Sequence, residues 1–347
     1  MTSRSARIVI AALIVMGCPG RAVAQLSELD NGIQRRVNSA TPTKAKLKEY
    51  KAEPWWSATI NARAARKLAA GTGVTVAIID TGVDLDHPAL RGQLRTDGYN
   101  FGDCAPERSP SCDPGSSPSP FDKLGHGTFV TGIIAAKDTQ NPHGYGLATE
   151  AKILPIKVNP GMMDDFTAES LAKGITYAKN RGARIINLSL DMPDISGHDR
   201  TLVENALRDA LNAGVFIVVA SGNRARDVSF PANHPGVIAV AGIDSSGTID
   251  RRSNHGHSVA IAAPSENIES TILGGGFGRR GGGTSFAAPF VSATLASMLQ
   301  LKPDLTFSQA KRILCNSATP IKGEENARCG MLNAGKALER TAQAKGL

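Results

Sequence analysis

The sequence predicts an α/β fold, a three-layer sandwich with a mostly parallel central sheet flanked by helices. Residues 152–220 alternate between β-branched apolar runs and helical segments, as parallel α/β sheets do. The run Val74–Asp80 (VTVAIID) is β-branched and mostly apolar and stops at an acid, which is typical of a strand covered on both faces. With 347 residues and 41% hydrophobic content, the chain can bury the core of one large domain. Right-handed crossovers would place helices on both faces of the sheet.

Residues 1–24 are predicted to be a signal peptide. Two arginines precede the apolar run Ile8–Met16, and Ala22-Val23-Ala24 forms a small-residue cleavage site. That run is too short to span a bilayer, and no later stretch reaches about 18 unbroken apolar residues, so we expect no transmembrane helix in the mature protein. The expected destination is export, to the medium or the periplasm.

The alternative for the N-terminus is a lipid anchor. Val15-Met16-Gly17-Cys18 resembles a lipobox, in which Cys18 would be acylated. Cleavage after Ala24 is favoured, because Met16 and Pro19 fit a lipobox poorly.

Residues 25–53 form a polar N-terminal extension that is too short to fold as an independent domain, and residues 54–344 form the expected main domain. The net charge of +8 comes partly from a basic tract, Arg35–Lys67. A basic tract can bind nucleic acid, but a solvated linker is the favoured interpretation because an exported protein does not meet nucleic acid as a target.

Cysteine use agrees with export. Apart from Cys18, four cysteines remain, and four permit three pairings. The local pairs Cys104–Cys112 and Cys315–Cys329 are favoured, because each would close a loop rich in small and polar residues. Free or metal-binding thiols are less well supported, because no CxxC spacing occurs.

The central elements can be taken in chain order. The first strand ends at Asp80, and polar groups at the carboxyl ends of strands in open α/β sheets mark ligand sites. His126 stands between two glycines at the start of an apolar helix, Phe129–Ala136. The elements expected next are strand Lys152–Val158, helix Ala168–Asn180, strand Arg184–Leu190, helix Arg200–Asn212, and strands Val215–Ala220, Val237–Ile243 and Val259–Ala262.

The C-terminal third contains a glycine run, Gly281–Gly283, ahead of a small-residue helix, Ser285–Leu301, in which Pro289 is expected to fit the first turn. The unpaired N–H groups at such a helix start attract negative charge, which suits a nucleophilic serine whose reaction generates an oxyanion. Alone, this stretch would be interpreted as a loop before a core helix. Two further helices are expected, one after a capping box of Thr306 and Gln309 and one over Asn333–Gln343.

Three segments place an acid, a histidine and a serine at the ends of core elements. They are AIIDTGVDLDHP (Ala77–Pro88), GHGTFVTGIIAA (Gly125–Ala136) and GTSFAAP (Gly283–Pro289). The order Asp, His, Ser and these flanking residues identify the chain as similar to the subtilisin-like serine proteases, the subtilases, from about Pro54 to Ala344.

The resemblance implies an exported serine endopeptidase that acts through an acyl-enzyme. Ser285 would be the nucleophile, His126 the general base and then acid, and Asp80 the group that orients the imidazole. Asn223 matches the asparagine that stabilises the oxyanion. An extended protein or peptide substrate would pair with the backbone near Leu188, Ser189, Leu190, Ala220, Ser221 and Gly222, and less securely with Gly161–Asp165. The alternative is a catalytically silent binding module, against which stand the four competent residues at the catalytic positions.

The chain departs from the family pattern at several positions. Phe129 stands where His is frequent, and Phe286 where Met is frequent. Asp191 replaces a usual Gly and would favour a basic substrate side chain, whereas Arg224 opposes it, so we predict no side-chain preference.

Cofactors and assembly complete the expectations. Ala89 replaces an acid that commonly binds the family's tight calcium, and Asp138–Gly146 does not clearly preserve a ligand loop. We therefore assign no metal ligand, although a structural calcium stays open. A monomer is expected. The extension at 25–53 is short for the folding propeptide of many secreted subtilases.

Overall fold

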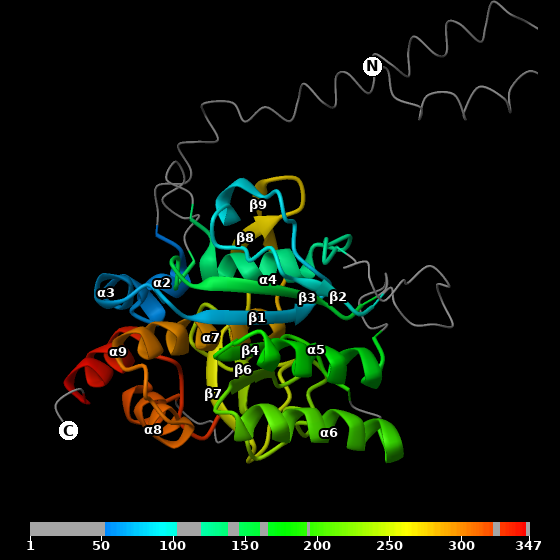
Figure 1. Cartoon of the computed structure of the whole chain (residues 1–347). Helices are drawn as coiled ribbons and strands as arrows, with labels where there is room; N and C mark the ends of the chain where they lie inside the picture. The colour runs from blue at the N-terminus through cyan, green and yellow to red at the C-terminus, as the bar shows by residue number, and fades with distance from the viewer. Residues whose placement is uncertain are drawn as a thin grey trace, which may run out of the picture. The chain divides into compact units, whose positions relative to one another are not determined.

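Seven strands form the central sheet of the computed structural model, in the order β2-β3-β1-β4-β5-β6-β7, and every neighbouring pair is parallel (Figure 1). The structure describes residues 53–102, 119–137, 146–159, 166–192, 195–321 and 327–344. The strands of this sheet are β1 (Thr75–Asp80), β2 (Tyr99–Asn100), β3 (Lys152–Lys157), β4 (Ile185–Leu188), β5 (Phe216–Ala220), β6 (Ile238–Ile243) and β7 (Val259–Pro264). The parallel α/β sheet expected from the alternating pattern is confirmed.

Helices cover both faces of this sheet and make three layers. The helical elements are α2 (Trp55–Thr59), α3 (Ala62–Leu68), η4 (Pro88–Leu90), α4 (His126–Ala135), α5 (Ala168–Asn180), α6 (Gly197–Asn212), α7 (Thr284–Leu301), α8 (Phe307–Ser317) and α9 (Ala334–Gln343). Helices α5 and α6 pack side by side on one face, and α4 and α7 lie on the other (Figure 1).

Strand β1 shows how its sequence serves both layers. Val76 and Ile78 belong to the core shared with α4 and α7, whereas Ala77 and Ile79 belong to the core shared with α5 and α6. Successive strand residues point to opposite faces, so a strand buried on both sides must be apolar at every position. This explains why the four residues directly before Asp80, Val76–Ile79, are all apolar.

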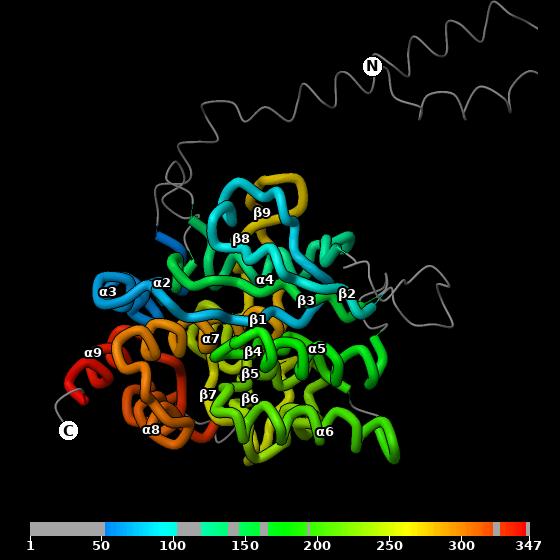
Figure 2. The backbone as a smooth tube through the Cα atoms, in the orientation of Figure 1, coloured from blue at the N-terminus to red at the C-terminus, as the bar shows by residue number. Residues whose placement is uncertain are grey.

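The two ends of the described chain meet beside the sheet. Helices α2 and α3 (blue) lie next to α9 (red) in Figure 2, and the amide of Ala334 donates to the carbonyl of Ile60 at 2.8 Å. The sequence pattern did not indicate α2 or α3. Their few apolar residues become buried through contact with the distant α9 and not through a periodic face of their own.

A second sheet was also missed. Strands β8 (Ile268–Ile272) and β9 (Gly276–Arg280) form an antiparallel hairpin in a stretch so rich in glycine that it resembles a loop. The hairpin packs on α4, where Ser270 Oγ donates to the carbonyl of Phe129 at 2.7 Å. A Cβ on Gly132 would lie 2.2 Å from Thr271 Oγ1, so the close approach of β8 to α4 requires glycine there.

The predicted signal peptide and polar extension, in residues 1–52, lie outside the described residues, and so does the predicted pair Cys104 and Cys112. Cys315 and Cys329 are joined by a disulfide.

The capping box at the start of α8 is confirmed, with Thr306 Oγ1 accepting from the amide of Gln309 and Gln309 Oε1 accepting from the amide of Thr306. Within the described ranges, no helix is long and apolar enough to cross a membrane.

Candidate active site

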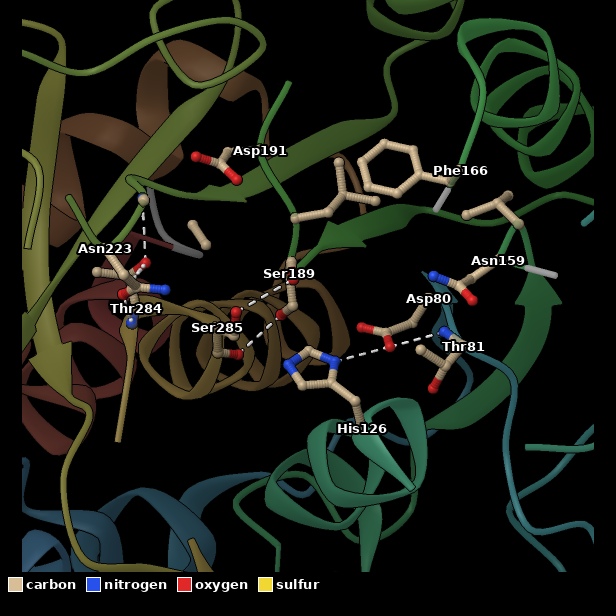
Figure 3. Close-up of a pocket in the computed structure, with 14 residues that line it drawn as sticks. Asp80, Thr81, His126, Asn159, Phe166, Ser189, Asp191, Asn223, Thr284 and Ser285 are labelled. Carbon is tan, nitrogen blue, oxygen red and sulfur yellow. Dashed lines mark hydrogen bonds and ion pairs between the residues drawn. The ribbon is translucent and has the colours of Figure 1, made fainter. Parts of the chain in front are cut away.

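Three predicted site residues, each from a different core element, lie together in Figure 3. Asp80 ends β1, His126 begins α4, and Ser285 is the second residue of α7. His126 Nδ1 lies 2.8 Å from Asp80 Oδ1, and the other imidazole nitrogen faces Ser285 (Figure 3). Because an ionised carboxylate can only accept, Nδ1 carries the hydrogen and the nitrogen facing Ser285 is free to accept a proton.

The Asp80 carboxylate is held by short contacts around the end of β1. Its Oδ1 also accepts from the amide of Thr81 at 2.7 Å. A Cβ on Gly127 would lie 2.1 Å from the carbonyl of Gly82 and 3.1 Å from Asp80 Oδ1, so only glycine lets α4 approach β1 this closely. The glycine that follows His126 in the sequence thus permits the contact between histidine and acid.

Burial and charge act in opposite directions on the His126 imidazole, which is 6% exposed. Burial lowers the pKa of His126, but the charge of Asp80 and its hydrogen bond to Nδ1 raise it more, so this pKa lies above the usual histidine value. Asp80 therefore favours the imidazolium, the form that results when the histidine accepts a proton.

Asp122 is an organising residue that the sequence interpretation missed. Its fully buried carboxylate accepts from the amides of Leu124, Gly125 and Thr128 and from the hydroxyls of Thr81 and Thr128, at 2.7–2.9 Å. These bonds satisfy N–H groups at the start of α4 and tie that helix to the turn after β1. An acid four residues before a histidine at a helix start was the available signal.

Ser285 is fixed by a reciprocal pair of contacts with Ser189. Its Oγ donates to the carbonyl of Ser189 at 3.1 Å, and Ser189 Oγ donates to the carbonyl of Ser285 at 2.8 Å. The second contact depends on Pro289, which has no N–H to offer the carbonyl four residues earlier. Pro289 is the sixth residue of α7, so its expected place in the first helical turn was wrong.

Asn223 follows β5 and is bonded to the residue before Ser285. Its Oδ1 accepts from the amide of Thr284 at 2.8 Å and from the Thr284 hydroxyl at 3.1 Å. Because Oδ1 is used in this way, the Nδ2 group is turned away from Thr284 and toward Ser285 (Figure 3).

A pocket opens beside these residues. Its lining residues are Asp80, Thr81, His126, Val158, Asn159, Phe166, Ser189, Leu190, Asp191, Ala220, Gly222, Asn223, Thr284 and Ser285. Among the expected substrate-binding residues, Leu188 and Ser221 are absent from this lining. Leu188 packs in the core between the sheet and α5 and α6, and the Ser221 hydroxyl bonds to Ser253 and to the carbonyl of Asn254. Residues 161–165 lie outside the described residues.

The two opposing charges noted in the sequence form an ion pair. Arg224 Nη1 lies 3.2 Å from Asp191 Oδ2, and Asp191 lines the pocket. The guanidinium offsets the carboxylate charge, so the pocket presents no uncompensated acid from this residue to a basic side chain.

The two unusual aromatic residues pack against one another. The rings of Phe129 and Phe286 have centroids 4.6 Å apart, and the Phe286 ring lies 5.8 Å from the His126 imidazole. The bulk of Phe286 is thus accommodated against α4 beside the histidine, where Phe129 provides a complementary surface. The two departures from the family pattern form one packed unit.

The positions at which the sequence raised a calcium ligand lie only partly within the described residues. Ala89 is buried within η4 and offers no side-chain ligand. In the described ranges, no group of three or more His, Cys, Asp or Glu side chains could hold a metal ion. Residues 138–145 of the other candidate loop lie outside those ranges.

Comparisons with known proteins agree with this arrangement. Residues 71–337 match the model of the subtilase family. Subtilisin Savinase of Lederbergia lenta is 34% identical over 286 residues, which cover 81% of this chain and 97% of that protein. The major intracellular serine protease of Bacillus subtilis (strain 168) is 36% identical over 232 residues, 65% of this chain and 68% of that protein.

Solved structures are also similar to this chain in fold. A cold-adapted subtilisin-like serine proteinase matches with a TM-score of 0.64 and 28% identity, over 76% of this chain and 88% of its own. MycP1 with its N-terminal propeptide removed matches with a TM-score of 0.71 and 27% identity, over 83% and 98%. With a family match over most of its length, the chain belongs to the subtilase family and is a subtilisin-like serine endopeptidase.

Proposed function

We propose that Ser285 attacks the scissile carbonyl, with His126 taking the Ser285 proton and returning it to the leaving amine. The observation that supports this most directly is the imidazole placed between Asp80 and Ser285, with Nδ1 2.8 Å from Asp80 Oδ1 (Figure 3). Ser285 Oγ donates to the carbonyl of Ser189, and a rotation about χ1 would turn it to His126. Asp80 would hold the tautomer and stabilise the imidazolium.

The oxyanion of the tetrahedral intermediate would be stabilised by the amide of Ser285 and by Asn223 Nδ2. Support comes from the bonds between Asn223 Oδ1 and Thr284, which leave Nδ2 as the outward-facing group. Donors fixed before the reaction stabilise charge that develops in the transition state without reorganisation.

Replacing Asn223 with alanine is expected to lower kcat about 100- to 1000-fold, a magnitude known from subtilisin itself, with little change in KM. The donor acts on the oxyanion and not on the ground-state carbonyl, so the transition state loses more than the bound substrate. Steady-state kinetics on a peptide amide would measure this, with thermal unfolding as a check on folding. A kcat within threefold of the wild type would contradict the role of Asn223.

The acyl part of an extended peptide would lie along Ser189 and Leu190, with its first side chain toward Ala220 and Gly222. Strand β4 ends at Leu188, and the next residue, Ser189, contacts Ser285. The backbone after Leu188 therefore leaves the sheet beside the pocket. Backbone pairing with an added strand would give affinity for many sequences. The Asp191–Arg224 ion pair supports no preference for a basic side chain.

We propose further that residues 1–24 are a signal peptide removed after Ala24, residues 25–53 a polar extension, and residues 54–344 the catalytic domain of an exported monomer. Lipidation at Cys18 is the alternative for the anchor. Relatives alone do not decide the location, because one of them is named as an intracellular protease. The disulfide between Cys315 and Cys329 supports an oxidising destination. No metal is proposed for the reaction.

The test of the function is covalent labelling with proteolysis. The folded protein should react with a fluorophosphonate, which loses fluoride as its phosphorus bonds to Ser285 Oγ. Mass spectrometry should then find the phosphonyl group on the Ser285 peptide. It should also degrade unfolded casein, and labelling should stop both activities. A folded protein that neither reacts nor cleaves would favour a silent binding module instead.

A further inference from the structure

The strand that leads to Ser285 places an arginine beside His126. Arg280 ends β9 and is half-buried, with its guanidinium 5.5 Å from the ring centroid of Phe129 and an Nη2 contact of 3.4 Å to the carbonyl of Leu124. A Cβ on Gly125, the residue before His126, would lie 2.9 Å from Arg280 Nη2. The positive charge therefore lies at the start of the helix that carries the histidine.

Arg280 differs from the neighbouring arginines in its charge balance. Arg224 pairs with Asp191, Arg252 with both Asp250 and Glu266, and Arg279 with Glu269, at 2.9–3.3 Å. In the described ranges, Arg280 has a ring and a carbonyl as its partners but no carboxylate. A cation that is half-buried without a countercharge can gain more from an incoming carboxylate than a paired one can.

The residues that line the pocket indicate on which side of the Ser285–His126 pair Arg280 lies. The pocket beside Ser285 is lined by His126 of α4 and by residues of β1, β5 and α7 and of the loops after β1, β3, β4 and β5, but not by Arg280, Gly125 or Leu124. Nor does Gly281 line it, and no atom lies within 4 Å of where a Cβ on Gly281 would be. If the acyl part occupies the pocket, the leaving part must pass on the other side of the Ser285–His126 pair, along Gly281 and Arg280.

We propose that Arg280 selects substrates with a carboxylate on the leaving-group side of the scissile bond, within the first two residues after it. This inference rests on the proposed function, because it takes the direction of the substrate from it. The carboxylate could belong to an Asp or Glu side chain or to the C-terminus of a peptide. Arg280 acts on binding and approach of the substrate and neither donates nor accepts a proton in the bond-breaking steps, although its charge lowers the pKa of His126.

The strand geometry offers a matched control. Arg279 precedes Arg280 on β9 and so points to the opposite face, where it is paired with Glu269 and its side chain is 72% exposed. Replacing Arg279 with glutamine removes the same charge from the same strand without touching the proposed carboxylate site.

The experiment uses internally quenched peptides that are identical except at the first or second residue after the cleaved bond, which carries Asp, Asn or Lys. A further pair ends two residues after the bond, as a free carboxylate or as an amide. The full chain, R280Q, R280E and R279Q are compared by kcat/KM, with cleavage positions verified by mass spectrometry. The aspartate peptide should exceed the asparagine peptide by about fivefold in the wild type and in R279Q. The preference should disappear in R280Q and reverse toward lysine in R280E.

Two controls separate the causes of failure. Cleavage of the asparagine peptide by the wild type tests the protease function alone, and without it both proposals fall together. If that peptide is cleaved but neither aspartate nor the free C-terminal carboxylate brings a gain, or R280Q keeps the gain, the role of Arg280 is refuted. Should R280Q not fold, the wild type decides, because an ionic preference must shrink between about 0.05 and 1 M salt. A gain confined to the free-carboxylate pair would identify the peptide C-terminus as the group recognised.

Discussion

Replacing Ser285 with alanine should lower kcat by about a million-fold, the loss known for subtilisin itself. The alanine protein has no oxygen to attack the carbonyl, so the acyl-enzyme route is closed and only the oxyanion donors and substrate positioning remain. The fold should be retained, since the Ser285 hydroxyl makes one contact, to the carbonyl of Ser189, while the Ser285 carbonyl keeps its bond from Ser189 Oγ.

The measurement is single-turnover and steady-state cleavage of a peptide amide, with thermal unfolding of both proteins. Ser308, an exposed serine of α8, gives a matched control, and its alanine variant should keep the wild-type kcat. Adding a His126→Ala change to the Ser285→Ala variant should cost little more, because the two residues act as one unit. A Ser285→Ala protein that retained a tenth of the wild-type rate would exclude the acyl-enzyme mechanism.

Replacing Asp80 with asparagine should lower kcat by about ten-thousand-fold. Asparagine has nearly the same shape, and its NH2 group would donate to Nδ1 and so favour the wrong tautomer of His126. That orientation gives up the bond from the amide of Thr81, because in the wild type both groups contact Asp80 Oδ1. The geometry would survive while the nitrogen facing Ser285 would carry a hydrogen and could no longer act as a base.

The same variant has a pH signature whose sign follows from the charges around His126. Activity requires the neutral imidazole, so kcat/KM of the wild type should rise with pH through a His126 pKa that lies above the usual histidine value. Burial lowers this pKa and Asp80 raises it. Without the carboxylate charge the pKa falls, and the acid limb of the residual activity should move to lower pH.

A pH profile of kcat/KM for the wild type and Asp80→Asn checks this shift. Asp97→Asn is the control, because Asp97 pairs with Arg95 away from the pocket and its loss should leave the limb in place. An acid limb that stayed where it was, or moved to higher pH, would show that Asp80 does not set the charge state of His126.

Much of the parallel sheet could be predicted from the chain because its signals are local. A strand segment buried on both faces must be apolar, as Val76–Ile79 of β1 and the whole of β5 are. The periodicity of α5 predicted bounds that the structure repeats. The positions of Asp80, His126 and Ser285 followed from polar residues next to such elements. Their mutual distances did not follow from any local pattern.

The features that the sequence did not predict share a different cause. The hairpin β8–β9 has a glycine-rich strand with almost no β-forming side chains, and it forms because β8 bonds to α4. Leu188 is buried in the core although its neighbours Ser189 and Leu190 line the pocket. Pro289 is tolerated in the second turn of α7 because Ser189, in the loop after β4, satisfies the carbonyl that proline leaves unpaired. Each depends on a partner distant in sequence.

The sequence by itself determined the order of buried strands and helices and the residue types at their ends, because burial and periodicity act on neighbouring residues. Only the tertiary structure decided that Phe129 and Phe286 form one packed unit, that Asp191 is offset by Arg224, and that Arg280 lies beside His126. Those relations are contacts between elements far apart in the chain, and their energies depend on distances that no local pattern encodes.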